Sequence, residues 1–336
     1  MSSKFSRREL LRKTSVSLLG GSFLLASAEE QALADAIETG HTRLPERRDP
    51  ETPMPNGKIK DLQISRLILG GNLIGGWAHA RDLLYVSRLF KAYNTPERIM
   101  ETFRIAENHG INTVLVTPGE IPFVTRYNRE FGGHLQSMVQ IWPDEKDPFG
   151  EIDKAFDLGA ETMYIQGAAA DRLVKGGKMD LLAELVERIQ LTGCPGGVGG
   201  HALTVVEECE RLGVAKDYYV KTFHPDQYWS AHPVEKREEF EVDAARHAEH
   251  DKFHDNIFDL YPDRTMAFMK SVKKPWVAFK TMAAGAVHPR EGFPFAFDNG
   301  ADFVAAGMFD FQVQEDVGYA LKALAGAKAR ERSWMA

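Results

Sequence analysis

Hydrophobic residues along this 336-residue chain recur in short continuous runs, each followed by small or polar residues. The pattern is clearest near the C-terminal end, where runs at 276–279 and 302–306 open into the turns 280–286 and 307–310. Continuous apolar runs bounded by Gly and Pro are typical of strands buried on both faces, as in a parallel sheet covered by helices. Such folds place their sites just past the C-terminal strand ends. We therefore look for functional side chains directly after each predicted strand.

Strand and helix patterns alternate along the rest of the chain. The predicted strands cover residues 64–69, 113–117, 134–142, 162–166, 193–201, 218–222, 276–279 and 302–306. The predicted helices cover residues 96–109, 123–131, 149–158, 180–191, 204–212, 262–272 and 314–325. Eight strands with intervening helices predict an α/β fold, a single (β/α)8 TIM barrel. An open doubly wound sheet is the alternative, but no Gly-x-Gly-x-x-Gly follows the first strand.

The first residues have the composition of an export signal. Arg7 and Arg8 precede a weakly apolar stretch, and small residues that suit cleavage follow at 26–28 and 32–34. This order is typical of a bacterial twin-arginine signal, and the apolar stretch is too short to span a membrane. We predict a signal peptide at 1–34, a polar lead-in at 35–56 and the barrel at 57–330. The expected location is periplasmic or otherwise extracytoplasmic, after passage through the twin-arginine machinery.

Charge and cysteine content narrow the function further. The formal net charge of −7 argues against nucleic acid or an anionic membrane surface as a partner. The remaining partner class is a small-molecule substrate. The only cysteines are Cys194 and Cys209, and their spacing leaves open whether they pair. The twin-arginine route carries folded proteins, often with a cofactor inserted, so a cofactor is suggested.

Three segments of the chain resemble aldo-keto reductases. They are Ile64-Ser65-Arg66-Leu67-Ile68-Leu69-Gly70, Gly110-Ile111-Asn112-Thr113 and Val304-Ala305-Ala306-Gly307-Met308. The resemblance implies a (β/α)8 barrel and a nicotinamide cofactor, NAD(P). The family's catalytic Asp, Tyr, Lys and His are absent from the positions that match, which hold Thr117, the stretch 119–122, the stretch 141–143 and Gln166. The fold kinship is therefore expected without the family's usual chemistry.

Two histidines suggest a metal site instead. His201 and His224 follow the adjacent fifth and sixth strands, so their rings are expected to approach each other. Two imidazoles with Glu120 or Asp310 would suit zinc or another divalent ion with an open position for substrate. Such an ion polarises a carbonyl or activates water. The alternative is that each histidine is a hydrogen-bonding loop residue.

Two lysines form a second candidate group. Lys221 and Lys280 occupy like positions on the sixth and seventh strands, and alternation can turn both side chains inward. Neighbouring ammonium groups lower each other's pKa, as does burial, which makes an amine nucleophilic enough to form a Schiff base. The placement is similar to that in deoxyribose-phosphate aldolases. Alternatively, one lysine pairs with Asp226 or Asp310, or binds a substrate anion.

Further polar residues after the strands are candidates for binding substrate. These are Asn72, His79, Arg81, Gln166 and Asp226. We expect an exported enzyme acting on a small sugar-like or hydroxy-carbonyl compound by metal-assisted lyase, isomerase or hydrolase chemistry. Glu120, Lys221, Lys280 and Asp310 are the predicted catalytic residues, and His201 and His224 the predicted metal ligands. The alternatives are a nicotinamide-dependent reductase with a rebuilt site and a barrel that binds a small molecule without catalysis.

Overall fold

The computed structural model describes residues 44–336 except 80–82, 84, 215 and 241–257. The predicted signal peptide and Arg81 lie outside the described residues. Among the residues that are described, no helix is both long and apolar enough to cross a membrane.

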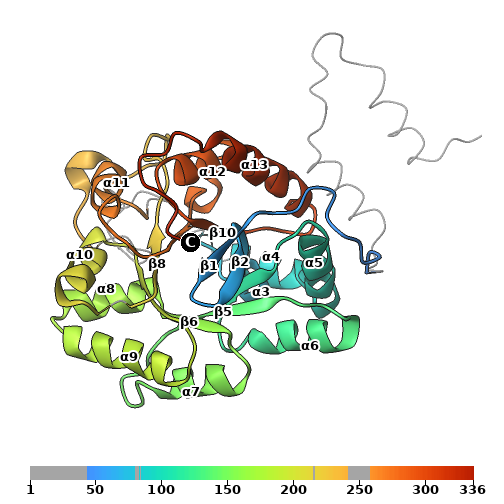
Figure 1. Cartoon of the computed structure of the whole chain (residues 1–336), viewed down its shortest axis with the longest axis horizontal. Helices are drawn as coiled ribbons and strands as arrows, with labels where there is room; N and C mark the ends of the chain where they lie inside the picture. The colour runs from blue at the N-terminus through green and yellow to red at the C-terminus, as the bar shows by residue number, and fades with distance from the viewer. Residues whose placement is uncertain (1–43, 80–82, 84, 215, 241–257) are drawn as a thin grey trace, which may run out of the picture.

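Eight parallel strands close into a barrel, as the apolar runs predicted (Figure 1). The closed order is β10-β3-β4-β5-β6-β7-β8-β9, so each strand lies beside its neighbour in sequence. The strands are β3 (Leu67–Gly70), β4 (Thr113–Val116), β5 (Gln136–Ile141), β6 (Thr162–Ile165), β7 (Gly196–Gly200), β8 (Tyr218–Thr222), β9 (Trp276–Phe279) and β10 (Phe303–Gly307). Because all eight run in one direction, their C-terminal ends meet at a single face, which we call the mouth.

Helices surround the barrel in Figure 1. They are α3 (Asn72–Gly75), α4 (Tyr85–Tyr93), α5 (Pro96–Asn108), α6 (Ile121–Phe131), α7 (Gly150–Asp157), α8 (Gly167–Lys175), α9 (Met179–Leu191), α10 (Leu203–Leu212), α11 (Pro262–Met269), α12 (Pro289–Asp298) and α13 (Val313–Gly326). The predicted helices are all present within a few residues, whereas α3, α4, α8 and α12 were not predicted. Pro294 inside α12 and the many alanines and glycines around α8 weaken the apolar periodicity there.

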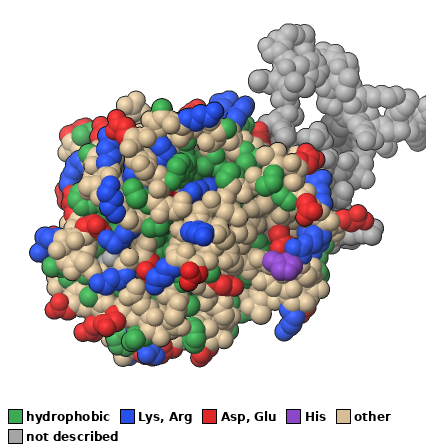
Figure 2. Space-filling model, viewed as in Figure 1, with side chains coloured by type: hydrophobic (Ala, Val, Ile, Leu, Met, Phe, Trp, Pro, Cys, Tyr) green, Lys and Arg blue, Asp and Glu red, His purple; other side chains and the backbone are tan. Residues whose placement is uncertain are grey.

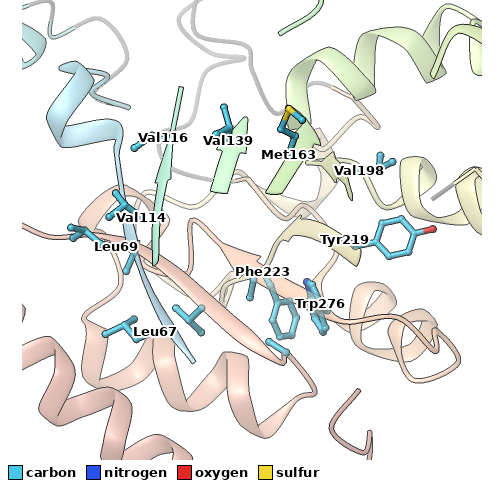
Figure 3. Close-up of a cluster of buried hydrophobic side chains, with 14 of the residues drawn as sticks. Leu67, Leu69, Val114, Val116, Val139, Met163, Val198, Tyr219, Phe223 and Trp276 are labelled. Carbon is cyan, nitrogen blue, oxygen red and sulfur yellow. The ribbon is translucent and has the colours of Figure 1, made fainter. Parts of the chain in front are cut away.

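Alternation along the strands separates an outer apolar layer from the barrel interior. Outward residues such as Leu69, Val116, Tyr219 and Trp276 pack under the helices in the larger core cluster (Figure 3). The inward residues form a second cluster, which includes Ile68, Leu115, Met138, Tyr164, Tyr218, Val220, Val277, Phe303 and Ala305. This interior is filled by side chains and forms no channel, and barrels of this kind carry their sites at the mouth.

A hairpin closes the opposite end of the barrel. Strands β1 (Asn56–Ile59) and β2 (Leu62–Ser65) pair antiparallel, and Ile59 and Ile64 are fully buried in the interior cluster. The prediction of one strand at 64–69 was therefore wrong at its start, because Ile64 belongs to the hairpin and the barrel strand begins at Leu67. In Figure 1 this hairpin lies over the centre of the barrel.

The C-terminal segment is fastened at the same end by Asp302. This fully buried carboxylate accepts hydrogen bonds from the backbone N–H groups of Trp276 and Met335, at 3.0 and 2.8 Å. It also pairs with Arg332 at 2.7 Å.

Figure 2 shows this face of the molecule, where acidic and basic side chains are interspersed. The pairing question for the cysteines is also answered, since Cys194 and Cys209 are both buried free thiols.

Candidate active site

Five side chains meet at the mouth: Asn72, His79, His201, Phe258 and Lys280, which we call the mouth cluster. The amide nitrogen of Asn72 lies 2.9 Å from Nε2 of His79, and Nζ of Lys280 lies 3.2 Å from the same ring nitrogen. Phe258 is the common neighbour, with ring centroids 5.2 Å from His79 and 6.5 Å from His201. The structure thus brings together four of the predicted site residues, which follow three barrel strands, β3, β7 and β9.

Lys280 reaches this cluster through an unusual backbone conformation. Strand alternation would place it with Ala278 in the outer layer, but its φ of +56° takes it out of the strand pattern. Nζ then lies 3.9 Å from the centroid of the Phe258 ring and 5.9 Å from that of Phe279. A left-handed conformation is costly for a residue with a side chain, and such strain is concentrated at functional sites. This conformation places the ammonium group of Lys280 at the mouth.

His201 is held by a buried acid. Its Nδ1 lies 2.7 Å from Oδ2 of Asp171, which is on α8, and the Asp171 carboxylate also accepts the backbone N–H groups of His201 and Ala202. Both side chains are more than nine-tenths buried. A carboxylate acceptor at Nδ1 fixes the tautomer that carries its proton there and leaves the lone pair on Nε2. A buried imidazole paired with a carboxylate in this way can work as a general acid–base group.

Glycines shape the wall around this pair. A Cβ added at Gly167, the first residue of α8, would lie 3.0 Å from Cε1 and 3.1 Å from Nδ1 of His201. In the glycine-rich strand β7, a Cβ at Gly199 would lie 2.8 Å from the backbone nitrogen of Gly167. A side chain at Gly197 would clash with the ring of Tyr218. The glycines therefore let β7 approach β6 and seat the imidazole against the start of α8.

His224 has a different environment from the one expected of a metal ligand. Its Nδ1 lies 2.7 Å from the carbonyl oxygen of Pro225, and its Nε2 accepts the backbone N–H groups of Phe258 and Asp259 at 2.9 and 3.0 Å. The ring is fully buried, and burial lowers its pKa to about 4. Because both ring nitrogens are engaged, His224 has no lone pair directed at a metal.

The metal prediction therefore gains no support from His224. Within the part of the chain that the structure describes, no group of three or more His, Cys, Asp or Glu side chains is arranged to hold a metal ion. His201 and His224 share Phe258 as a ring neighbour, with ring centroids 6.5 and 6.3 Å from it. A metal at this site remains a prediction.

The expectation that Lys221 turns inward was wrong. Residue 221 has the same strand parity as Tyr219, which packs in the outer cluster, whereas Val220 lies in the barrel interior. The fully buried Nζ of Lys221 donates to Oγ1 and the carbonyl oxygen of Thr222, both at 2.9 Å. It also pairs with Asp259 at 3.3 Å. The two lysines therefore do not form a pair of mutually activating amines.

Glu120 lies beneath the α3 turn. Its carboxylate accepts the backbone N–H of Thr117 at 2.8 Å, and a Cβ at Gly75 would lie 2.0 Å from its Oε1. Burial raises the pKa of Glu120 to about 7, while the hydrogen bonds from Thr117 oppose the rise. The side chain therefore titrates near neutrality, and it fits only because Gly71 and Gly75 lack side chains.

The other predicted residues are engaged in local structure. Gln166 accepts the N–H of Ala169 and so caps α8, at 3.1 Å. Asp226 pairs with the buried guanidinium of Arg237 at 2.6 Å. The two oxygens of Asp310 accept from Tyr93 at 2.7 Å and from Arg98 at 3.0 Å. Each of these carboxylates or amides thus stabilises a loop near the mouth.

Two residues of the site were missed in the sequence. Asp171 lies in an apolar, alanine-rich stretch just after the fourth strand, and a lone acid in such a stretch was the available signal. Phe258 follows a charged region and precedes Asp259, and nothing in that pattern indicates a ring at the mouth. Its position depends on contacts with β8 that are distant in sequence.

Comparisons with known proteins bear on the fold. No family model matches the chain, and neither does any curated protein. The structure is similar to a Pseudomonas aeruginosa protein assigned to the aldo-keto reductases, with a TM-score of 0.53 and 16% identity over 82% of this chain and 98% of that one. A truncated 3-deoxy-D-arabino-heptulosonate 7-phosphate synthase from Thermotoga maritima gives a TM-score of 0.45 and 11% identity, over 82% of this chain and 94% of that one. The resemblance to aldo-keto reductases is thus confirmed for the barrel fold.

Proposed function

We propose that this chain is an acid–base enzyme that moves a proton on a carbon next to a carbonyl group of a small polar substrate. The observation that carries the proposal is the buried His201–Asp171 pair at 2.7 Å, at the same mouth as the Lys280 ammonium. Phe258 and Phe279 are neighbours of both groups. An imidazole base and a fixed cation beside apolar rings are the groups that an isomerase or lyase acting on hydroxy-carbonyl compounds needs.

Each group has a distinct part in the reaction. Nε2 of His201 accepts the proton from carbon. The electron pair of the broken C–H bond forms a C=C bond, and the π pair of the carbonyl group moves onto its oxygen. Lys280 stabilises the negative charge that develops on that oxygen. Return of the proton to the former carbonyl carbon, with transfer of the neighbouring hydroxyl proton to the enolate oxygen, completes an isomerisation. Loss of a β-leaving group from the enolate completes an elimination. Asp171 stabilises the imidazolium that forms in between.

Exchange of substrate hydrogen for deuterium tests this proposal without knowledge of the product. The protein is incubated in D2O with a panel of aldoses, ketoses and 2-keto acids, and loss of the C–H signal is followed by proton NMR. We expect His201→Gln and Asp171→Asn to slow exchange by about 10²–10⁴-fold, the usual contribution of a general base. His134→Gln, at a side chain that is 75% exposed, is the matched control. Exchange that survives in His201→Gln contradicts the proposal.

Lys280 also has the placement for imine formation. An amine that attacks a carbonyl carbon forms a Schiff base with loss of water, and borohydride reduces that imine to a stable adduct. Intact mass after borohydride treatment with each carbonyl compound distinguishes the two roles. An adduct that is lost in Lys280→Arg assigns covalent chemistry, whereas its absence leaves Lys280 as a fixed charge.

A nicotinamide-dependent reductase is the second candidate, favoured by the turn after β9. Ala283, Ala284 and Gly285 all have positive φ values, and this turn leads into the N-terminus of α12. Turns of this kind and helix N-termini bind phosphate groups. Saturable quenching in a fluorescence titration with NADPH would support this candidate, and a flat titration would remove it.

Export through the twin-arginine pathway remains part of the proposal. It is supported by Arg7, Arg8 and the small residues that follow. Replacing both arginines by lysine is expected to keep the protein in the cytoplasm, as cell fractionation would show.

The metal prediction is tested by measuring the metal content of protein purified without chelator. One tightly held equivalent that is lost in His201→Ala would support it.

A further inference from the structure

The C-terminal end of β8 is joined to residues 258–259 by a set of buried hydrogen bonds. Thr222 Oγ1 donates to the carbonyl oxygen of Phe258 at 2.8 Å, and Nε2 of His224 accepts the N–H groups of Phe258 and Asp259. Lys221 Nζ donates to Oδ1 of Asp259 at 3.3 Å. These hydrogen bonds fix the backbone N–H and carbonyl groups of Phe258 and the side chain of Asp259. We call Lys221, Thr222 and His224 the β8 clamp.

The clamp is connected internally and to the neighbouring elements. Lys221 Nζ lies 2.9 Å from Oγ1 of Thr222, and that hydroxyl is also within 3.1 Å of the carbonyl oxygen of His201. Asp259 accepts a further hydrogen bond from Thr265, in the first turn of α11, at 3.0 Å. All these groups are buried, so loss of one partner leaves another polar group without a hydrogen bond. The clamp therefore has one well-defined arrangement.

Phe258 is the residue that this arrangement presents to the mouth. Its backbone is held by the clamp, and its ring lies 3.9 Å from Nζ of Lys280 and contacts three imidazoles, those of His79, His201 and His224. An ammonium over an aromatic face is stabilised in its charged form by the ring quadrupole. The ring also covers one side of the amine.

We propose that Phe258 is a wall of the active site that sets the reactivity of Lys280, and that the β8 clamp residues are positioning residues for Phe258. The inference rests on the proposed function for the importance of Lys280. It gives Lys221 and His224, which the sequence suggested as catalytic and metal-binding residues, a role that acts through Phe258.

Competitive acetylation with trace acetic anhydride tests the inference, because it measures the reactivity of Lys280 without any turnover. Peptide mass spectrometry compares labelling of Lys280 with that of the exposed Lys58 on β1 in the same sample. Phe258→Leu is expected to raise the relative rate at Lys280 by about five-fold, because the aromatic face that stabilises the ammonium group is removed.

Thr222 allows the clamp to be tested with small changes. Thr222→Val removes the hydroxyl, and we expect about a two- to five-fold rise in Lys280 labelling, since Phe258 loses an anchor. Thr222→Ser keeps the hydroxyl and is expected to restore the wild-type rate. The matched control is Thr162→Val, because Thr162 is a buried barrel-strand threonine whose hydroxyl bonds to Pro195 and Tyr218 instead.

The outcomes separate this inference from the proposed function. A folded Thr222→Val or Phe258→Leu protein whose Lys280 labelling equals that of wild type overturns it, as does an equal rise in Thr162→Val. Changed labelling together with no deuterium exchange by the wild-type protein would sink the proposed function and leave the positioning of Lys280 by Phe258 in place. If Thr222→Val fails to fold, the comparison of Phe258→Leu with wild type decides.

Discussion

Replacing His224 by glutamine tests whether this buried imidazole must stay neutral. In the native state its Nε2 accepts two backbone N–H groups, from Phe258 and Asp259, and its Nδ1 is bonded to the carbonyl oxygen of Pro225. Protonation of Nε2 removes the acceptor, so both amides lose their partner inside the protein. Glutamine offers an oxygen acceptor and an N–H donor but does not titrate.

The magnitude follows from the pKa values. Burial lowers the pKa of His224 from 6.5 to about 4. At about 1.36 kcal/mol per unit this corresponds to about 3 kcal/mol of stability. Because the folded-state pKa is the lower one, this stability is fully present above pH 6.5. It is lost progressively as the pH falls from 6.5 to 4.

Glu120 acts in the opposite direction over an overlapping range, so total stability is not the useful quantity. The assay is urea unfolding of wild type and His224→Gln at pH values from 4 to 7.5, and the result is the difference between their free energies of unfolding. That difference is expected to shift in favour of the variant by about 3 kcal/mol between pH 6.5 and 4. His134→Gln, at an exposed ring, is the control variant. A constant difference for His224→Gln would refute the reasoning.

The remaining predictions concern other buried groups. Burial raises the pKa of Glu120 from 4.5 to about 7, so wild type loses about 3 kcal/mol as the pH rises from 4.5 to 7; Glu120→Gln should lack this loss in the same urea assay. Gly167→Ala should cost about 1–3 kcal/mol and slow deuterium exchange, because its methyl group displaces the His201 ring, whereas Gly318→Ala, with no atom within 4 Å of the new Cβ, should do neither. Asp302→Asn should cost about 3–5 kcal/mol in urea unfolding by breaking a buried ion pair, and a cost below 1 kcal/mol would contradict the role given to Asp302.

Apolar runs were sufficient to predict the barrel, because strands buried on both faces leave a strong local pattern. The runs at 218–222 and 276–279 coincide with β8 and β9. The start of the first strand was misplaced because Ile64 and Leu67 are both apolar and buried, and only tertiary pairing separates the hairpin from the barrel. The pattern of apolar runs therefore predicted which segments are strands, but it did not predict that Ile64 pairs in a hairpin.

The site was predicted less completely, because it depends on where each side chain points and not only on where its residue stands in the sequence. Lys221 and Lys280 both stand at strand ends, yet one points outward by alternation and the other enters the mouth through a left-handed backbone. His201 was recognised as a candidate, but its partner Asp171 is thirty residues earlier, on helix α8. Distances between such elements are fixed by the closed barrel and are not encoded in any short motif.

The central claim is that His201, oriented by Asp171, exchanges a proton with a carbon next to a carbonyl group. The most direct measurement is the rate of deuterium exchange into the panel compounds by wild type, Asp171→Asn and His201→Gln. The account predicts exchange into at least one compound, slowed by about 10²–10⁴-fold in both variants. Exchange that proceeds equally in all three proteins, or none by the wild type with any hydroxy-carbonyl compound, would contradict it.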